Sequence, residues 1–224
     1  MMEKIDDFAR RIKVEYGMFQ QAILGKYSRL IAGQITPKAS ADFVRESHTM
    51  AESLIELIAG EAQVYLTAMH FGEAIPEMDS QTLEASLMMV KHALHTNISQ
   101  LVSLIRMAAT GMAANGTPMG QLAKKRLDKV EFTVIDGAQR RWDAMRYVVT
   151  VMRDFAVQTD LNKTIADLKA REFKLAKVIY DNPEKIDREF VFAIDEKVGD
   201  YPLFYDIRGR VFHPNTTARV IGHV

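Results

Sequence analysis

The side chains of this chain that could do chemistry include six histidines, several acidic pairs and one dense group of basic residues. His92 and His95 are spaced so that both fall on one face of a helix, where two imidazoles can bind a metal ion. They flank Leu94, which the hydrophobic pattern places in a core, and no carboxylate lies within one turn of them in the sequence. We therefore expect a polar stripe beside a helix seam and assign no metal site.

The usual sequence signatures of enzymes are missing from this chain. It has no cysteine, which excludes a disulfide, a thiolate metal cluster and a cysteine nucleophile. It also lacks the glycine-rich phosphate loops, the H-E-x-x-H zinc motif and the G-x-S-x-G nucleophile elbow. Asp195 and Glu196 are adjacent, so they point to opposite faces of an extended chain and suit a solvated loop. We expect no catalytic residue and no cofactor.

One stretch of the chain concentrates positive charge and could meet phosphate groups or an acidic protein surface. The alternative is a set of solvated helix faces whose partners are the nearby residues Asp128, Glu131, Asp136 and Asp143. The chain as a whole has 29 Lys and Arg against 29 Asp and Glu, which gives no support to general binding of nucleic acid. Trp142 lies directly after Arg140 and Arg141 and is expected to anchor a core. The basic residues are Lys124, Lys125, Arg126, Lys129, Arg140, Arg141, Arg146 and Arg153.

Long helices are predicted to position these groups in the first half of the chain. Apolar residues recur there at steps of three or four, which lays one apolar stripe along each helix. The breaks at Gly33–Pro37 and Gly72–Asp79 favour an antiparallel bundle, and Thr36 or Ser40 can cap the second helix. The pattern predicts helices over about residues 5–30, 40–69 and 80–114, and a shorter one over about 117–129.

The second half changes to short alternating runs that are typical of strands. A strand over residues 130–135 ends at Asp136-Gly137, a strong turn signal, and a helix is predicted over about 143–171. Further strands are predicted at Leu175–Tyr180, Phe190–Ile194 and Thr217–Ile221. The expected fold is α+β, with a helical domain over residues 1–115 and a small α+β domain over 116–224 that holds a short mixed or antiparallel sheet.

The sequence gives no sign of a membrane segment or a signal peptide. The longest uncharged stretch, Met107–Ala123, is rich in Gly, Thr, Asn and Gln and falls short of the roughly 20 apolar residues of a membrane span. The first residues mix acidic and basic side chains, unlike the start of a signal peptide. We expect a soluble protein.

Four short sequence segments in the second half of the chain together form a recognisable motif through their order and spacing. They are residues 109–124, with a Gly116-Thr117 cap before a short helix; Thr133–Trp142, which reads TVIDGAQRRW; a helix with Tyr147, Met152, Arg153 and Asn162; and Arg208–Asn215, which reads RGRVFHPN. Together they resemble the minor head proteins of tailed bacteriophages, the family that contains the Mu gpF-like (MuF) domain. The likeness covers about residues 105–224.

The chain departs from the family pattern at several positions. Gln139 stands where a turn glycine is usual, and Asp154 replaces a threonine after Arg153. The spacing from Arg153 to Asn162 is one residue longer, and Thr216-Thr217 replaces a Cys-Arg pair. Because the chain has no cysteine, no metal or cysteine cluster of the family carries over to it.

The resemblance implies a structural protein of the virion that needs no catalysis. Its partners would be the phage portal protein, the major capsid protein or both, with packaged DNA and further copies of itself as additional candidates. It would act in head assembly or in DNA packaging or delivery, in the phage head and in the host cytoplasm during assembly. His213, Pro214 and Asn215 would fix the last turn before the terminal strand, with the Asn215 amide bonding the backbone. The basic stretch would touch DNA or the portal.

Two other functions remain open from the sequence. One is a helical protein–protein interaction or scaffold module whose partner is unrelated to a virion. The other is an ADP-ribosyltransferase-like enzyme in which Arg153 or Arg208 anchors the nicotinamide dinucleotide. Such an enzyme is expected to carry a Ser-Thr-Ser strand and an E-x-E loop, and the sequence has neither.

Overall fold

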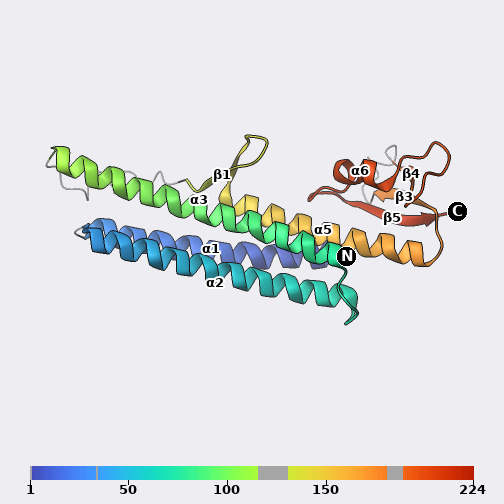
Figure 1. The fold of residues 1–224 in the computed structure, drawn as a ribbon, viewed down its shortest axis with the longest axis horizontal. Helices are drawn as coiled ribbons and strands as arrows, with labels where there is room; N and C mark the ends of the chain where they lie inside the picture. Colours follow the sequence, from blue (N-terminus) through green and yellow to red (C-terminus); the bar gives the residue numbers. More distant parts are fainter. Residues whose placement is uncertain (1, 34, 116–130, 181–188) are drawn as a thin grey trace. The chain divides into compact units, whose positions relative to one another are not determined.

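The computed structural model describes residues 2–33, 35–115, 131–180 and 189–224, and its elements are drawn in Figure 1. Long helices occupy the first half, and a hairpin, a further long helix, a three-stranded sheet and a short helix follow, so the α+β fold is confirmed. The elements are α1 Met2–Ala32, α2 Pro37–His70, α3 Glu77–Asn115, β1 Thr133–Ile135, β2 Arg141–Asp143, α5 Ala144–Ala170, β3 Leu175–Tyr180, β4 Phe190–Ala193, α6 Phe204–Val211 and β5 Ala218–His223.

The chain forms two compact units that are each discontinuous in sequence. The unit that we call the sheet unit contains the residues up to Phe8, then Ala62–Glu84 and Met152–Val224. The unit that we call the helical unit contains Ala9–Glu61 and Ala85–Val151. Each unit therefore takes residues from both sides of the boundary expected between residues 115 and 116.

The helical unit is built on α1, α2 and α3. Arg11 of α1 pairs with Glu61 of α2 at 2.8 Å, and Tyr27 meets Phe43 with ring centroids 6.2 Å apart. Residue numbers rise along α1 as they fall along α2, so the two helices are antiparallel, as expected. The oxygen of Thr36 accepts a hydrogen bond from the Ala39 N–H at 3.1 Å and caps the start of α2.

The sheet unit packs α5 and α6 against an antiparallel sheet in the order β4-β3-β5. The strands are short, and their inward side chains meet the apolar faces of both helices. Removing these side chains from water stabilises the unit by about 1.5–3 kcal/mol for each fully buried large one. The buried cluster consists of Leu161, Ile165, Leu168, Ala176, Val178, Phe192, Ile194, Phe204, Ile207, Val211 and Phe212.

Most of the predicted elements are confirmed, including β3 at the expected residues and β4 and β5 within two residues of theirs. The pattern missed β2 and the eight-residue helix α6. Gly209 lies inside α6 and Pro202 just before it, and both residue types indicate loops when read locally. The short helix predicted over residues 117–129 lies outside the described residues. None of the helices in the described part of the chain has an apolar stretch long enough to cross a membrane.

Candidate functional site

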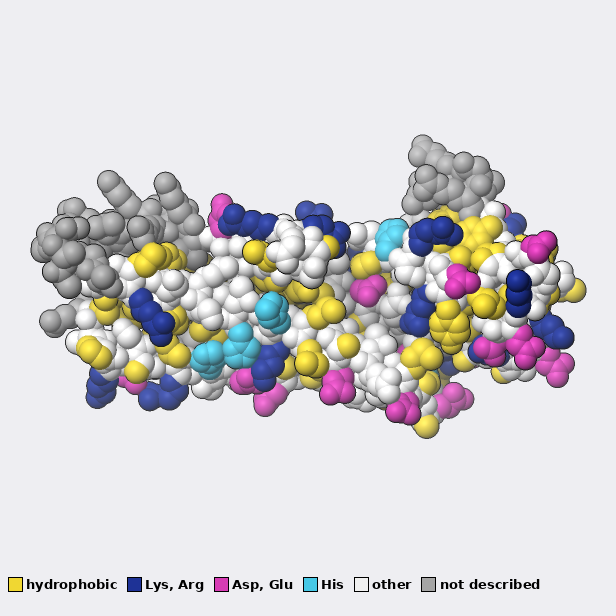
Figure 2. All heavy atoms as spheres, turned by 45° about the horizontal axis from the view of Figure 1, so that its top comes forward, with side chains coloured by type: hydrophobic (Ala, Val, Ile, Leu, Met, Phe, Trp, Pro, Cys, Tyr) yellow, Lys and Arg dark blue, Asp and Glu magenta, His cyan; other side chains and the backbone are white. Residues whose placement is uncertain are grey.

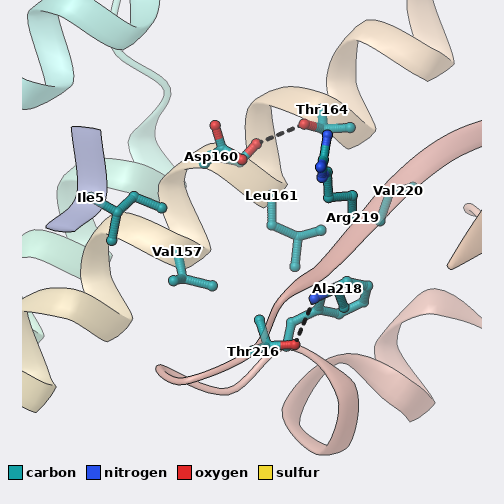
Figure 3. Close-up of a pocket in the computed structure, with 10 residues that line it drawn as sticks. Ile5, Val157, Asp160, Leu161, Thr164, Thr216, Ala218, Arg219 and Val220 are labelled. Atoms are coloured by element: carbon teal, nitrogen blue, oxygen red, sulfur yellow. Dashed lines mark hydrogen bonds between the residues drawn. The ribbon is translucent and has the colours of Figure 1, made fainter. Parts of the chain in front are cut away.

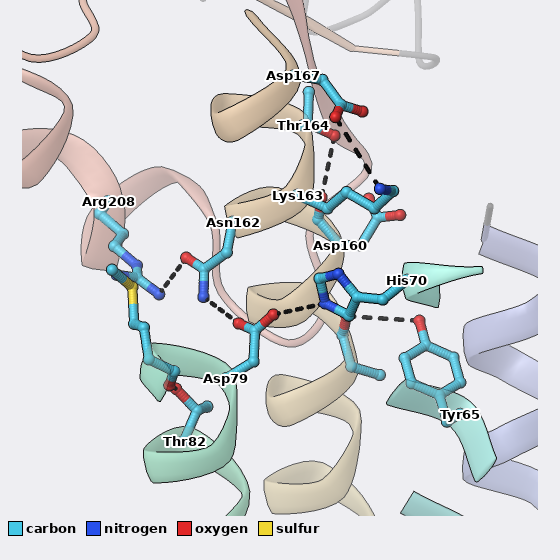
Figure 4. Close-up of polar contacts among 12 residues, drawn as sticks. Tyr65, His70, Asp79, Thr82, Asp160, Asn162, Lys163, Thr164, Asp167 and Arg208 are labelled. Atoms are coloured by element: carbon cyan, nitrogen blue, oxygen red, sulfur yellow. Dashed lines mark hydrogen bonds and ion pairs between the residues drawn. The ribbon is translucent and has the colours of Figure 1, made fainter. Parts of the chain in front are cut away.

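Asp79 belongs to a polar network in the sheet unit, whose contacts are drawn in Figure 4. Its side chain is fully buried in the first turn of α3. Asp79 Oδ2 is 2.9 Å from His70 Nε2, at the end of α2, and Oδ1 accepts a hydrogen bond of 2.6 Å from Asn162 Nδ2 of α5. A buried carboxylate requires such donors because it has lost its water. Asp79 thus ties three helices together.

Arg208 of α6 extends this network on the other side of Asn162. Its Nη2 donates to Asn162 Oδ1 at 3.0 Å, and its Nε donates to Gln158 Oε1 at 2.7 Å. Gln158 Nε2 in turn donates to the Phe212 carbonyl at 2.8 Å. The Asn162 amide therefore donates to a carboxylate through Nδ2 and accepts from a guanidinium through Oδ1. The network fixes α6 on α5.

Asp154 adds a second acidic group near Gln158. Burial raises the pKa of the Asp154 carboxyl, while a hydrogen bond from Gln158 and the charges of Arg208 and His213 oppose that shift. Position 154 is one of those at which this chain departs from the minor head pattern. The aspartate gives Gln158 an acidic neighbour that a threonine would not supply.

The network contains one residue that the sequence analysis assigned to the family-like motif, Asn162, and one from the closing motif, Arg208. Arg153 is also on α5, but it pairs with Asp6 of α1 at 2.8 Å and does not join the network. His70, Asp79 and Gln158 were missed. The only local signal was at Asp79, because an acidic residue in the first turn of a helix favours the helix dipole, and that signal does not indicate a partner on α5.

The turn before β5 forms where His213, Pro214 and Asn215 were expected to fix it. The Asn215 backbone N–H donates to His213 Nδ1 at 3.2 Å, whereas we had expected the Asn215 side-chain amide to bond the backbone. The hydroxyl of Thr216 donates to the Val211 carbonyl at 2.9 Å and accepts from the Ala218 N–H at 3.1 Å. The threonine therefore joins the end of α6 to the start of β5.

A small pocket lies in the same unit between α5 and β5 (Figure 3). Its volume is about 30 Å³, which is room for one or two water molecules. Asp160 and Thr164 of α5 line one side, and Thr216 and Arg219 line the other. Burial raises the pKa of the Asp160 carboxyl to about 6. The pocket thus holds an acid that is charged at neutral pH at a cost to stability.

Replacing Asp160 with Asn is expected to stabilise the protein at pH 8 and to change little at pH 4. The folded-state pKa of about 6 is above the 3.8 that is usual for an aspartate, so the stability contributed by the neutral acid is present below about pH 4 and is lost as the pH rises through 6. We expect the Asn variant to gain about 1–2 kcal/mol at pH 8 in urea unfolding.

Asp167→Asn is the control for this prediction, since Asp167 is on the same helix with its side chain 64% exposed. It should change the free energy of unfolding by less than about 0.5 kcal/mol at both pH values. An equal gain for Asp160→Asn at pH 4 and pH 8 would contradict the prediction.

Of the basic residues, Arg140 and Arg141 lie on the hairpin of β1 and β2 in the helical unit, and Arg146 and Arg153 lie on α5. Asp136 accepts hydrogen bonds from the backbone N–H groups of Ala138 and Arg140, from Arg140 Nε and from Trp142 Nε1, at 2.7–3.0 Å. These donors, with the Arg140 backbone N–H first, lower the pKa of Asp136 to about 2. Arg141 pairs with Glu131 at 3.2 Å. Arg140 and Arg141 therefore have intrachain partners, whereas Lys124, Lys125, Arg126 and Lys129 lie outside the described residues.

Trp142 is only partly buried, so the expectation of a core anchor was wrong. Its ring lies in β2, 6.2 Å from the ring of Tyr147 and near the guanidinium groups of Arg140 and Arg146, at 5.5 and 5.9 Å from the centroid. A strand of three residues on a hairpin offers little volume around a large side chain. The indole is instead held by its hydrogen bond to Asp136 and by cation–π contacts.

Replacing Gln139 with Gly is expected to stabilise the hairpin. Gln139 has a φ of 60°, in the left-handed region that costs a side chain energy and that glycine adopts freely. We expect a gain of about 0.5–1 kcal/mol in the free energy of unfolding, measured by chemical denaturation. Ala138→Gly is the matched control and should lose a similar amount, since Ala138 has no positive φ. A loss for Gln139→Gly would contradict this account.

In the helical unit, His95 pairs with His48 and not with His92. His95 of α3 faces His48 of α2 with ring centroids 5.0 Å apart, while His92 is exposed. Burial lowers the pKa of His95, and the charges of His48 and Lys91 act in the same direction. Among the described residues, no group of three or more His, Asp or Glu side chains is arranged to hold a metal ion.

Comparison of the chain with known protein families, with curated proteins and with solved structures gave no match.

Proposed function

We propose that this chain is a structural minor head protein of a tailed bacteriophage, which acts in head assembly or in DNA packaging or delivery beside the portal or the coat lattice. The observation that carries the proposal is the bond between Asn162 and Arg208. These residues come from two separate family-like segments, and they meet at 3.0 Å in the Asp79 network. Residues that are characteristic of one domain are expected to contact each other, as Asn162 and Arg208 do through this hydrogen bond.

The helical unit exposes several methionines that are suited to contact with a partner. Met18 of α1 is 61% exposed, and Met88 and Met89 of α3 are 68% and 49% exposed. Methionine is flexible and polarizable, so exposed methionines adapt to the surface of a partner. A protein that contacts a portal or a coat lattice requires such surfaces, whereas an isolated monomer gains nothing from them.

The test is the mass of the complexes that the protein forms. We would mix the purified full chain with the portal protein and the major capsid protein encoded beside it and measure light scattering after size exclusion. The proposal expects co-elution with one of them at a mass above the 25.4 kDa of the chain alone. Met88→Gln with Met89→Gln should weaken this complex, and Lys174→Gln in the sheet unit serves as the control.

A protein that stays at 25.4 kDa in both mixtures would contradict the proposal. Mass spectrometry of purified phage particles gives an independent result, because a minor head protein is present in the particle at a few copies. Its absence from the particles, together with a stable complex with some other protein, would favour the helical interaction module.

The exposed methionines support that second function as well, since they would serve any protein partner. The contacts of the two arginines give less support to the ADP-ribosyltransferase hypothesis than to the two binding functions. Both proposed anchors of the nicotinamide dinucleotide are engaged internally, Arg153 by Asp6 and Arg208 by Gln158 and Asn162. A dinucleotide would have to displace these contacts before it could bind.

A further inference from the structure

Two histidines face each other across α2 and α3 in the helical unit. The rings of His48 and His95 have centroids 5.0 Å apart and planes inclined at 38°, and both side chains are partly exposed. Figure 2 shows histidine side chains, in cyan, beside charged side chains on the face in view. The pair is therefore open to ions in solution and is carried by two helices rather than by mobile loops.

The separation of the two rings fits one shared metal ion. Imidazole nitrogens bind Zn²⁺ at about 2.0–2.1 Å, and in a tetrahedral arrangement this places the centroids of two ligating rings about 5 Å apart. The rings of His48 and His95 already have that separation. To bind one ion, a nitrogen of each ring has to turn toward a common point, and each histidine has two side-chain torsions through which it can do so.

Two charged side chains near the histidines affect how strongly a cation would bind there. Glu52 follows His48 by one helical turn, and its Oε1 is 3.9 Å from His95 Nε2, so a negative charge lies beside the His95 ring. Lys91 Nζ is 3.4 Å from the same oxygen and offsets part of that charge. His92 is adjacent to Lys91 in sequence and exposed, and it does not share the ring contact.

We propose that His48 and His95 form a site for one divalent transition-metal ion of the zinc class, with water molecules completing its coordination. Imidazole suits zinc, copper and nickel, whereas magnesium and calcium prefer oxygen ligands. The ion would link α2 to α3 through side chains 47 positions apart and would stabilise the helical unit by binding only its folded form. This site is independent of the proposed function.

The experiment uses the full chain with any histidine tag removed, at pH 7.5. Zn²⁺ is titrated in by isothermal calorimetry, and thermal unfolding is followed with Zn²⁺ and, separately, with Mg²⁺. We expect one strong site for Zn²⁺, a rise in Tm with Zn²⁺ and no rise with Mg²⁺. His48→Ala and His95→Ala should each weaken Zn²⁺ binding by more than about ten-fold. Circular dichroism without metal checks that both variants fold.

His92→Ala is the matched control, because it removes an exposed histidine one turn from His95 and should change the affinity by less than about three-fold. Lys91→Gln should strengthen binding, since it removes the positive charge beside Glu52. The proposal is overturned if Zn²⁺ does not bind, or if it binds equally to the His48→Ala variant. A loss in His92→Ala as large as in His95→Ala would also overturn it, since the ion would then sit on α3 alone.

Discussion

Replacing Asp79 with Ala is expected to lower the free energy of unfolding by about 3–5 kcal/mol. The substitution leaves the Nδ2 group of Asn162 and the Nε2 group of His70 without their acceptor inside the sheet unit, where the Asp79 side chain is fully buried. It also removes the negative charge that lies beyond Asn162 from the Arg208 guanidinium. Urea unfolding followed by circular dichroism measures the loss, and hydrogen exchange should increase in α6 first.

Two variants distinguish the roles of shape and charge at this position. Asp79→Asn keeps the shape and one acceptor, so it should lose about 1–3 kcal/mol. Glu77→Gln, in the same turn of α3 but exposed, should change stability by less than about 0.5 kcal/mol. If Asp79→Ala cost no more than Glu77→Gln, the network would not hold the sheet unit together.

Replacing Gly222 with Ala is expected to destabilise the sheet unit by about 1–3 kcal/mol, the second largest effect among these substitutions. Gly222 lies in the edge strand β5, opposite Ala176 of β3. A Cβ atom at this position would lie 2.6 Å from Cε1 of the Phe173 ring, closer than two carbon atoms can approach. The ring covers the glycine and must move aside, although it packs against the buried cluster and lies under the Arg171 guanidinium.

Combining Gly222→Ala with Phe173→Ala tests whether the clash with the Phe173 ring causes this loss of stability. In a Phe173→Ala background the ring is gone, so Gly222→Ala should then cost less than about 0.5 kcal/mol. Thermal or urea unfolding of the four proteins gives the coupling energy between the two positions. If the cost of Gly222→Ala were the same in both backgrounds, the loss would come from the strand itself and the contact with Phe173 would have no part in it.

The elements of this fold were predictable because each depends on residues close in sequence. The apolar steps of three and four in α1, α2 and α3, and the alternation in β3, repeat within a few residues and need no knowledge of the partner. This periodic pattern did not predict an element that is short or that contains a residue typical of loops. Helix α6 has eight residues and an internal glycine, and its Phe204, Ile207 and Val211 are buried only because the sheet lies beside them.

The Asp79 network was predictable only in part. Asn162 and Arg208 were singled out by resemblance, yet nothing near either residue indicated the other, since they are 46 positions apart. Asp79 lies 83 positions from Asn162 and could be taken for an ordinary acidic residue at the start of a helix. Likewise, the sequence offered His92 as the companion of His95, and the helix pairing supplied His48 instead.

The sequence by itself determined the long helices, most strands, the turn at Asp136 and the absence of cysteine chemistry, since these follow from local periodicity and composition. Only the tertiary structure decided which polar groups meet. A buried carboxylate, amide or imidazole is stable where a partner replaces its lost water, and that partner can come from any segment that the packing brings within about 3 Å. For Asp79, Arg208 and His48 that segment lies far away along the chain.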